Sequence, residues 1–197
     1  MQPKTLLEMA GADLTPPPLA EAVLVLIDCQ NEYVTGALPL EGVETALENL
    51  AGLLARARAA GTPIVHVQHK GRPGGAFDLA QARGAIHELV APLAGEVVIQ
   101  KGLPNSFAGT GLHDALQEFD RNNLILTGFQ THMCVSATAR SALDHGYRST
   151  IVADCCGTRA LPDRKGGMLS AAALHEATLA ALADRFAIVV DSAAELA

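Results

Sequence analysis

The sequence predicts a single α/β domain, in which a doubly wound sheet of about six mainly parallel strands carries helices on both faces. Short β-branched apolar runs alternate with longer Ala- and Leu-rich stretches, as in repeated βαβ units. The 197 residues match the length of one compact domain. Hydrophobic residues make up 49% of the chain and charged residues 18%, which favours a packed core over disorder.

The expected strands are short apolar runs in which β-branched residues dominate. They span 22–28, 63–68, 96–100, 123–127, 150–153 and 187–190. In open α/β sheets, ligands bind at the carboxyl ends of the strands. We therefore expect the loops after residues 28, 68, 100, 127 and 153 to line the functional site.

Helical spacing of apolar residues fills the gaps between these strands. Gly61 ends the helix predicted over 43–60, Thr110 is a candidate cap for the one over 110–119, and Gly146 ends the one over 131–145. The predicted helices span 43–60, 79–90, 110–119, 131–145 and 168–184.

Residues 1–19 are predicted to form an N-terminal arm that lies on the surface or on a partner subunit. They show no clear period and contain three consecutive prolines, Pro16 to Pro18. Residues 20–197 form the single predicted domain, and no internal repeat is found in them.

Charge and cysteine usage narrow the class of protein. The formal net charge is −7 and no basic cluster occurs, so nucleic acid and anionic membranes are not expected partners. No apolar run reaches the ~20 residues of a membrane span, and the first residues do not form a signal-peptide pattern. A cytoplasmic protein acting on a small molecule is expected. The four cysteines lack zinc-site spacing, so we expect neither structural zinc nor a disulfide framework.

Asp28 and Lys101 hold equivalent positions at the ends of predicted strands. A carboxylate at the end of the apolar run AVLVLID is costly to bury unless it has a partner or a function. By the alternation of side chains along a strand, Gln30 lies on the same face as Asp28, whereas Cys29 points to the opposite face. Such a carboxylate serves as a general base when a nucleophile lies within reach, or as a helix cap. Lys101, if it faces Asp28, keeps that carboxylate ionised; otherwise it is a solvated surface charge.

Cys134 carries the strongest local signal for catalysis. It follows the strand NLILT and a turn at Gly128, and with Thr131 as N-cap it occupies the third position of a helix. The helix macrodipole and free N–H groups lower the pKa of a thiol there, as a nucleophile requires. The alternative is a small buried cysteine that only packs under the helix.

Three segments resemble the isochorismatase-like cysteine hydrolases, relatives of nicotinamidases and N-carbamoylsarcosine amidohydrolases. They are LVLIDCQNEY, VIQKGLPNSFAGT and LTGFQTHMCVSATARSALDHGY, and they occur in the order of that family. The resemblance extends from about residue 20 to 191 and implies a Rossmann-type three-layer sandwich.

The resemblance also implies a catalytic triad and a reaction. Asp28 would take the thiol proton and return it to the leaving nitrogen, Lys101 would support both charges, and Cys134 would form a thioester acyl-enzyme. A cis peptide bond maps to Phe129 and Gln130, and the N–H groups of Gln130 and Cys134 would form the oxyanion hole. The expected activity is hydrolysis of a non-peptide C–N bond in an amide, carbamoyl or ureido compound.

This chain departs from the metal-dependent nicotinamidases, which have an aspartate and two histidines after the second strand. The chain has VHVQHKGRPGGAFD there, and His66 and His69 would face opposite sides of an extended strand. No metal site and no cofactor are therefore expected. Isochorismatases that cleave a vinyl ether resemble this fold but replace the nucleophile with a small residue, so Cys134 disfavours that alternative.

Five residues are candidates for binding substrate. Arg72 and Phe77, in the loop after the second strand, could clamp a carboxylate and a ring, or belong to a surface loop. The other three candidates are Gln30, Phe107 and His132. Phe107 could equally be a core residue, and His132 a residue of the helix start.

Two further classes of function and one assembly state complete the hypotheses. The protein could be a thiol-redox or small-molecule-binding module, with Cys134 as an oxidisable sensor, or a structural homologue without activity. A redox sensor does not need three polar residues on three separate loops. The Ala-rich composition and the family resemblance predict a homo-oligomer, a dimer or tetramer, and the sequence leaves open whether a neighbouring subunit contributes to the pocket.

Overall fold

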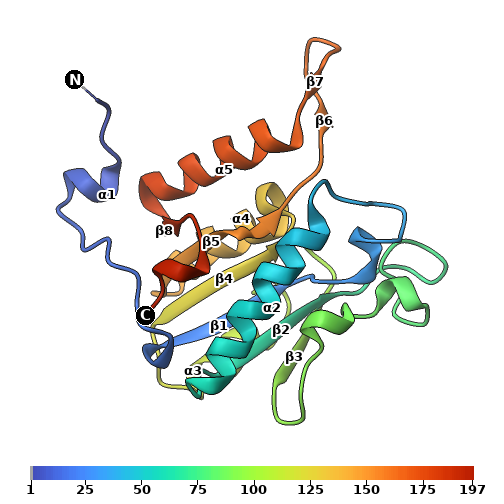
Figure 1. Cartoon of the computed structure of the whole chain (residues 1–197), viewed down its shortest axis with the longest axis horizontal. Helices are drawn as coiled ribbons and strands as arrows, with labels where there is room; N and C mark the ends of the chain where they lie inside the picture. Colours follow the sequence, from blue (N-terminus) through green and yellow to red (C-terminus); the bar gives the residue numbers. More distant parts are fainter. Residues whose placement is uncertain (1) are drawn as a thin grey trace.

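A computed structural model describes residues 2–197, and its centre is a six-stranded sheet (Figure 1). The strand order is β3-β2-β1-β4-β5-β8, with every neighbouring pair parallel, so the predicted doubly wound sheet is confirmed. The strands are β1 (Ala22–Ile27), β2 (Ile64–His69), β3 (Val97–Lys101), β4 (Asn123–Phe129), β5 (Arg148–Gly157) and β8 (Ala187–Val190). A small antiparallel hairpin, β6 (Leu161–Pro162) and β7 (Met168–Leu169), projects from the body (Figure 1).

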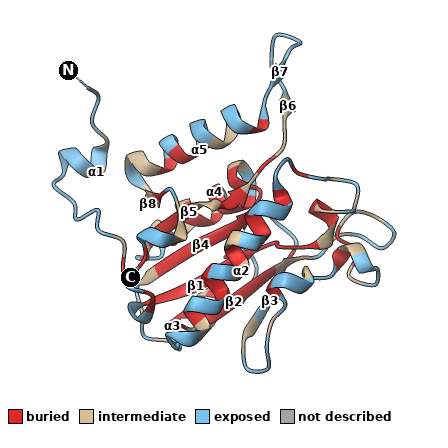
Figure 2. Cartoon of the chain, viewed as in Figure 1, coloured by how far each residue is buried: buried red, intermediate tan, exposed pale blue. Residues whose placement is uncertain are grey.

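Helices cover both faces of this sheet, and alternate residues of its strands form the two cores. On β1, Leu24 and Leu26 face one core, whereas Val23, Val25 and Ile27 face the other. The first core is closed by α2 (Val43–Ala59), and the second by α3 (Leu112–Gln117), α4 (Ser136–Asp144) and α5 (Ala171–Arg185). The central strands are therefore buried on both sides, as Figure 2 shows.

The helix predicted over 79–90 is wrong. The segment contains only two short 3₁₀ turns, Ala82–Gly84 and Glu88–Val90. Its carbonyl groups are taken by side chains from elsewhere: Gly84 O accepts from Gln30 Nε2 over 2.8 Å, and Ala82 O accepts from Asn31 Nδ2 over 2.9 Å. These tertiary hydrogen bonds replace the ones that a helix would make within itself.

The helix predicted over 168–184 begins later than expected. Met168 and Leu169 pair with β6 instead, and the helix starts at Ala171 after Ser170. Ser170 Oγ accepts from Ala173 N over 3.2 Å, which satisfies one of the free N–H groups of the first turn.

The N-terminal arm lies against its own chain. It contains one short helix, α1 (Leu6–Met9), and Leu6 N donates to Asp184 Oδ1 of α5 over 2.9 Å. Arg148 Nη2 then holds the arm further along, by donating to Asp13 O over 2.9 Å and to Thr15 O over 2.7 Å. No helix within residues 2–197 has the length and hydropathy needed to cross a bilayer.

A polar network fixes the first residues of β3 against α2 and β2. Glu96 accepts from Arg58 Nε at 2.8 Å and Leu93 N at 2.9 Å, and its Oε2 lies 2.8 Å from His66 Nε2. Burial raises the pKa of Glu96, but the bonds from Arg58, Leu93 and His66 outweigh it and lower the pKa to about 2. The ionised carboxylate is therefore the form that the fold stabilises.

We expect Glu96→Gln to lower the free energy of unfolding at pH 7 by about 1–2 kcal/mol, since bonds to a charged group are weakened. An unpaired Glu titrates near ~4.3. Because the folded pKa lies lower, the contribution is fully present above that pH and is lost as the pH falls towards about 2. Urea denaturation at pH 7 and pH 3 measures it. The exposed Glu48→Gln is the control, and an equal effect of both variants at pH 7 would refute a special role for Glu96.

Candidate active site

Three side chains from separate strand ends meet at the carboxyl edge of the sheet. Asp28 follows β1, Lys101 is the last residue of β3, and Cys134 lies in the turn after β4. Lys101 Nζ donates to Asp28 Oδ2 over 2.7 Å and to Cys134 Sγ over 3.2 Å. The exposed fractions are 0% for Asp28, 2% for Lys101 and 3% for Cys134, so the contact is largely shielded from bulk water.

The chain leaves β1 sharply at Asp28, which has a φ of 53° in the left-handed region. Aspartate tolerates this conformation better than most residues that have a Cβ. Asp28 N still donates to Val67 O of β2 over 2.9 Å, so the backbone stays joined to the sheet while it turns. The carboxylate is thereby held at the edge where Lys101 and Cys134 arrive.

The approach of β4 to the end of β1 depends on Gly128. This residue has a φ of 107°, and a Cβ at its position would collide with Ile27 O. The bond between Phe129 and Gln130, directly after it, is cis. Glycine is therefore the residue type that lets the strand bring Cys134 next to Asp28.

The turn that carries Cys134 differs from the predicted one. Residues Thr131–Val135 form a π-helical turn in which Val135 N donates to Gln130 O over 3.2 Å. Thr131 is not the N-cap that we predicted, because its Oγ1 pairs with His175 Nδ1 at 2.9 Å and caps no N–H group of the turn. Cys134 therefore does not occupy the third position of an α-helix.

The protonation state of the thiol also differs from the prediction. Burial, reinforced by the charge of Asp28, raises the pKa of Cys134 to about 12, although Lys101 opposes the shift. A helix start lowers a thiol pKa only where desolvation does not dominate. At neutral pH the resting thiol keeps its proton, so it needs a base to become a nucleophile.

Asp28 is placed to act as that base. Oδ2 accepts from Lys101, whereas Oδ1 is buried and has no hydrogen-bond partner among residues 2–197. Burial raises the pKa of Asp28, and the positive charge of Lys101 opposes this shift. The carboxyl group thus has one oxygen fixed and one available for a proton.

His69 is a member of this site that sequence reasoning considered only as a metal ligand. Lys101 Nζ also lies 3.3 Å from His69 Nδ1 and donates to Leu103 O over 3.1 Å. Burial, and then the charge of Lys101, lower the pKa of His69 to about 4, so the ring is neutral at pH 7. With Nδ1 accepting from Lys101, the ring hydrogen lies on Nε2. His66 points away, towards Glu96, and no cluster of three or more His, Cys, Asp or Glu in the described chain could hold a metal ion.

Gln30 is buried beside the site, and its amide is used by the backbone. Gln30 Nε2 donates to His69 O over 3.0 Å and to Gly84 O over 2.8 Å, while Oε1 accepts from His69 N over 2.8 Å. The residue therefore ties the end of β1 to the end of β2 and positions His69. We had grouped it with the substrate-binding residues.

The two loop candidates do not come together. Phe77 is buried, with its ring centroid 5.1 Å from that of Tyr33 and 5.0 Å from that of His69. Arg72, in contrast, is exposed. Phe77 therefore packs against the ring of His69. Phe77 and Arg72 do not form the clamp that we predicted for a substrate carboxylate and ring.

Phe107 lies in the second core, stacked on His145 with centroids 4.7 Å apart and on Tyr147 at 6.0 Å. His132 is half-buried, and its Nδ1 lies 2.6 Å from Thr158 Oγ1.

Sequence reasoning missed Arg159. Its charge lowers the pKa of His132, after the larger effect of burial. Arg159 Nε is buried without a hydrogen-bond partner in the described part of the chain. Arg159 follows the carboxyl end of β5, which runs to Gly157 and not to the predicted residue 153, so the strand-end rule did not single it out.

Comparison with known proteins agrees with the fold and covers the whole site. A family model described as the isochorismatase domain matches residues 22–194. The secreted isochorismatase effector Isc1 of Verticillium dahliae is 37% identical over 87% of this chain and 88% of its own length. Maleamate amidohydrolase of Pseudomonas putida is 36% identical over 69% of this chain and 72% of its own. The crystal structure of an isochorismatase from Pseudomonas putida KT2440 has a TM-score of 0.95 and 43% identity, and the match covers 100% of both chains.

The hydrogen bonds of Gln30 lead to a test of its role. We expect Gln30→Ala to lower the free energy of unfolding by about 2 kcal/mol, because the backbone N–H and C=O of His69 lose their partner, whereas Gly84 O keeps its bond from Gln68 Nε2 over 3.0 Å. Denaturant unfolding measures this, with the exposed Gln117→Ala as the control. Wild-type stability combined with a raised KM would instead identify Gln30 as a substrate ligand.

Proposed function

Because this chain belongs to the isochorismatase family, we propose that it is a cysteine hydrolase that cleaves a non-peptide C–N bond in a small molecule. The observation that carries the proposal is the buried contact of one ammonium group, Lys101 Nζ, with both Asp28 and Cys134. A base, a nucleophile and a positive charge within hydrogen-bond reach are the parts that acyl transfer needs. Amidohydrolases among the relatives, such as maleamate amidohydrolase, support this chemistry.

In the first half of the reaction, Asp28 Oδ1 removes the thiol proton as Cys134 Sγ attacks the carbonyl carbon of the substrate. The thiol pKa of about 12 means that transfer to a carboxylate is unfavourable before attack, so proton transfer and attack occur together. Lys101 offsets the negative charge that passes from Asp28 to sulfur. The N–H groups of Gln130 and Cys134 donate to the developing oxyanion.

In the second half, Asp28 returns the proton to the leaving nitrogen as the C–N bond breaks, which releases an amine or ammonia and leaves a thioester on Cys134. Asp28 then takes a proton from a water molecule, whose oxygen attacks the thioester. The C–S bond breaks, the acid product leaves, and the proton returns to sulfur. Each step uses one carboxylate that is alternately base and acid.

Arg159 extends the proposal to the substrate. Arg159 follows the carboxyl end of β5, its charge acts on the pKa of His132, and its buried Nε lacks a partner among residues 2–197. Such a guanidinium group suits a carboxylate on the substrate. The relative maleamate amidohydrolase acts on a compound that bears such a group. We therefore propose that the scissile C–N bond belongs to an amide, carbamoyl or ureido compound that also carries a carboxylate. In this arrangement His132 and neutral His69 contact the rest of the substrate.

Two alternatives have weaker support. Vinyl ether hydrolysis, as the name of the effector Isc1 denotes, does not require the thiol that this chain holds against Lys101. A thiol-redox sensor needs an accessible thiolate, whereas Cys134 is 3% exposed and has its pKa raised to about 12. Hydrolysis of a C–N bond uses all three side chains.

We further propose a homo-oligomer in the cytoplasm. Met168 is 72% exposed and Leu169 38% exposed on the projecting hairpin of β6 and β7, an apolar surface that a second copy can cover (Figure 1). All four cysteines are free thiols, as in a reducing compartment. Light scattering during size-exclusion chromatography gives the molar mass, and cell fractionation gives the location.

The catalytic roles are tested by ammonia release from a panel of small amides, ureas and carbamoyl compounds. We expect Cys134→Ala to abolish turnover and Asp28→Asn to lower kcat by about 10²–10⁴-fold, because each removes a step of the proton and acyl transfers. Intact-mass spectrometry of rapidly quenched wild-type enzyme should show an acyl adduct on Cys134. The control is Cys155→Ala, which removes a thiol from the first core.

The pH dependence has a defined sign. Because burial raises the pKa of Asp28 above the ordinary aspartate value of ~3.9, kcat/KM should fall with decreasing pH at a higher pH than an unperturbed aspartate would give.

Turnover that survives in both Cys134→Ala and Asp28→Asn would exclude the mechanism. Loss of folding in both would show a structural role only.

The carboxylate preference is tested with Arg159→Gln. For amides that bear a carboxylate, we expect KM to rise by about ten-fold or more, because the variant loses one hydrogen bond between charged groups and such a bond contributes that much to affinity. KM for neutral amides should remain unchanged. Arg164→Gln, on the exposed loop between β6 and β7, serves as the control. Equal effects on both classes of substrate would assign Arg159 to another task.

A further inference from the structure

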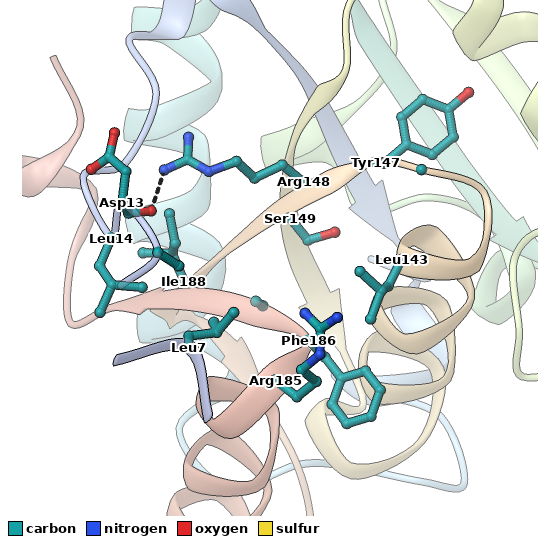
Figure 3. Close-up of a pocket in the computed structure, with 13 residues that line it drawn as sticks. Leu7, Asp13, Leu14, Leu143, Tyr147, Arg148, Ser149, Arg185, Phe186 and Ile188 are labelled. Carbon is teal, nitrogen blue, oxygen red and sulfur yellow. Dashed lines mark hydrogen bonds between the residues drawn. The ribbon is translucent and has the colours of Figure 1, made fainter. Parts of the chain in front are cut away.

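A cavity of about 300 Å³ lies at the amino ends of β5 and β8, at the opposite edge of the sheet from the turn that carries Cys134. Figure 3 shows the side chains that line it. It opens beside the first residues of β5 and β8, between the N-terminal arm and the ends of α4 and α5. The arm supplies one wall, so the cavity exists with the arm in place. Its apolar wall consists of Leu7, Leu14, Leu143, Phe186, Ala187 and Ile188.

Two guanidinium groups border this apolar space. Arg148 crosses one edge, where its Nη2 donates to Asp13 O over 2.9 Å, the bond drawn in Figure 3, and to Thr15 O over 2.7 Å. Arg185 is exposed at the end of α5 and takes part in no ion pair within the described chain. The carboxylate of Asp13 points away from the cavity (Figure 3). Because Asp13 also lines the cavity, two guanidinium groups stand against one carboxylate, and the net charge of the rim is positive.

Ser149 adds a buried polar group to the wall. The residue is 2% exposed, and its Oγ has no hydrogen-bond partner in the described part of the chain. Its side chain lies beside Leu143 on the same wall (Figure 3). A buried hydroxyl without a partner costs free energy, and a ligand oxygen in the cavity would relieve that cost.

We propose that this cavity binds a small monocarboxylate with an apolar body, at a site separate from the catalytic one. The apolar body lies against Leu14, Leu143 and Ile188, and the carboxylate pairs with Arg185, whose planar group suits two-oxygen recognition. Ser149 donates to a carboxylate oxygen. Few polar groups on a mainly apolar wall are typical of small-molecule sites.

The size of the cavity favours a small molecule over a segment of protein. Its volume is at the lower end of the ~300–1,000 Å³ range of ligand sites. A helix is roughly 10 Å across with its side chains, so a helical segment of a second copy would have to displace the arm. The arm is held by Arg148 and by the bond of Leu6 N to Asp184.

The test uses octanoate and 3-phenylpropanoate as probes, with octanol, 3-phenylpropanol and acetate as comparisons. Calorimetric titration of the full chain should show saturable one-to-one binding of at least one of the two carboxylates. The matched alcohol should bind about ten-fold more weakly, because it lacks the charge, and acetate should not bind because it lacks the apolar body. Methyl NMR signals of Leu7, Leu14, Leu143 and Ile188 should shift on binding.

Three variants locate the bound probe. Arg185→Gln should weaken the affinity about ten-fold or more, and Ser149→Ala should weaken it by a smaller factor. Arg185→Lys should restore part of the affinity lost in Arg185→Gln, because it returns the charge. Arg164→Gln is the matched control and should bind as the wild type does.

Three results would overturn the proposal. The first is no saturable binding of either carboxylate at millimolar concentration. The second is binding that is lost in Arg159→Gln but kept in Arg185→Gln, which would place the probe in the catalytic site. The third is self-association that Leu14→Asp abolishes, without probe binding, which would make this surface an interface between copies of the chain.

Discussion

The buried ion pair of Lys101 and Asp28 is the interaction on which the rest of the site depends. Moving two charges out of water costs several kcal/mol for each ion, and only close geometry with further hydrogen bonds offsets that cost. Here Nζ lies 2.7 Å from Oδ2 and also contacts Leu103 O, His69 Nδ1 and Cys134 Sγ. Such an arrangement tolerates little displacement, so the strands that carry the two charges must be held firmly.

The sheet provides that firmness through its register. Lys101 lies on β3 and Asp28 after β1, so β2 separates them. Within this layer His69 of β2 is the register partner of Lys101, and Gln30 fastens the end of β1 to His69 by two bonds. The cores on both faces keep the strands in place. The positions of Asp28 and Lys101 at the carboxyl edge of the sheet thus depend on the packing of the two hydrophobic cores.

The same burial sets the protonation state of Cys134, the proposed nucleophile. A thiol shielded from water beside a carboxylate holds its proton, and these surroundings raise the pKa of Cys134 to about 12. In the proposed reaction that proton therefore passes to Asp28 as the attack on the substrate begins. The opposite end of the sheet is built differently, with an apolar cavity under two arginines and the arm. The turn that carries Cys134 leads into α4, and Leu143, which lines the cavity, lies near the end of that helix. Helix α4 therefore connects the proposed active site to the cavity.

The sequence by itself determined six strands, the helix α2 and the strand-end positions of Asp28, Lys101 and Cys134, because alternation and helical period are local properties. It did not set every bound, since β5 runs on to Gly157 beyond the predicted residue 153, and α4 begins only at Ser136, after the π-helical turn. Only the tertiary structure decided that residues 79–90 form no helix, since Gln30 and Asn31 take their carbonyls. It also reversed the expected pKa shift of Cys134 and revealed Arg159. Burial and electrostatics depend on distances through space, which the register of the sheet sets and no local pattern of residues contains.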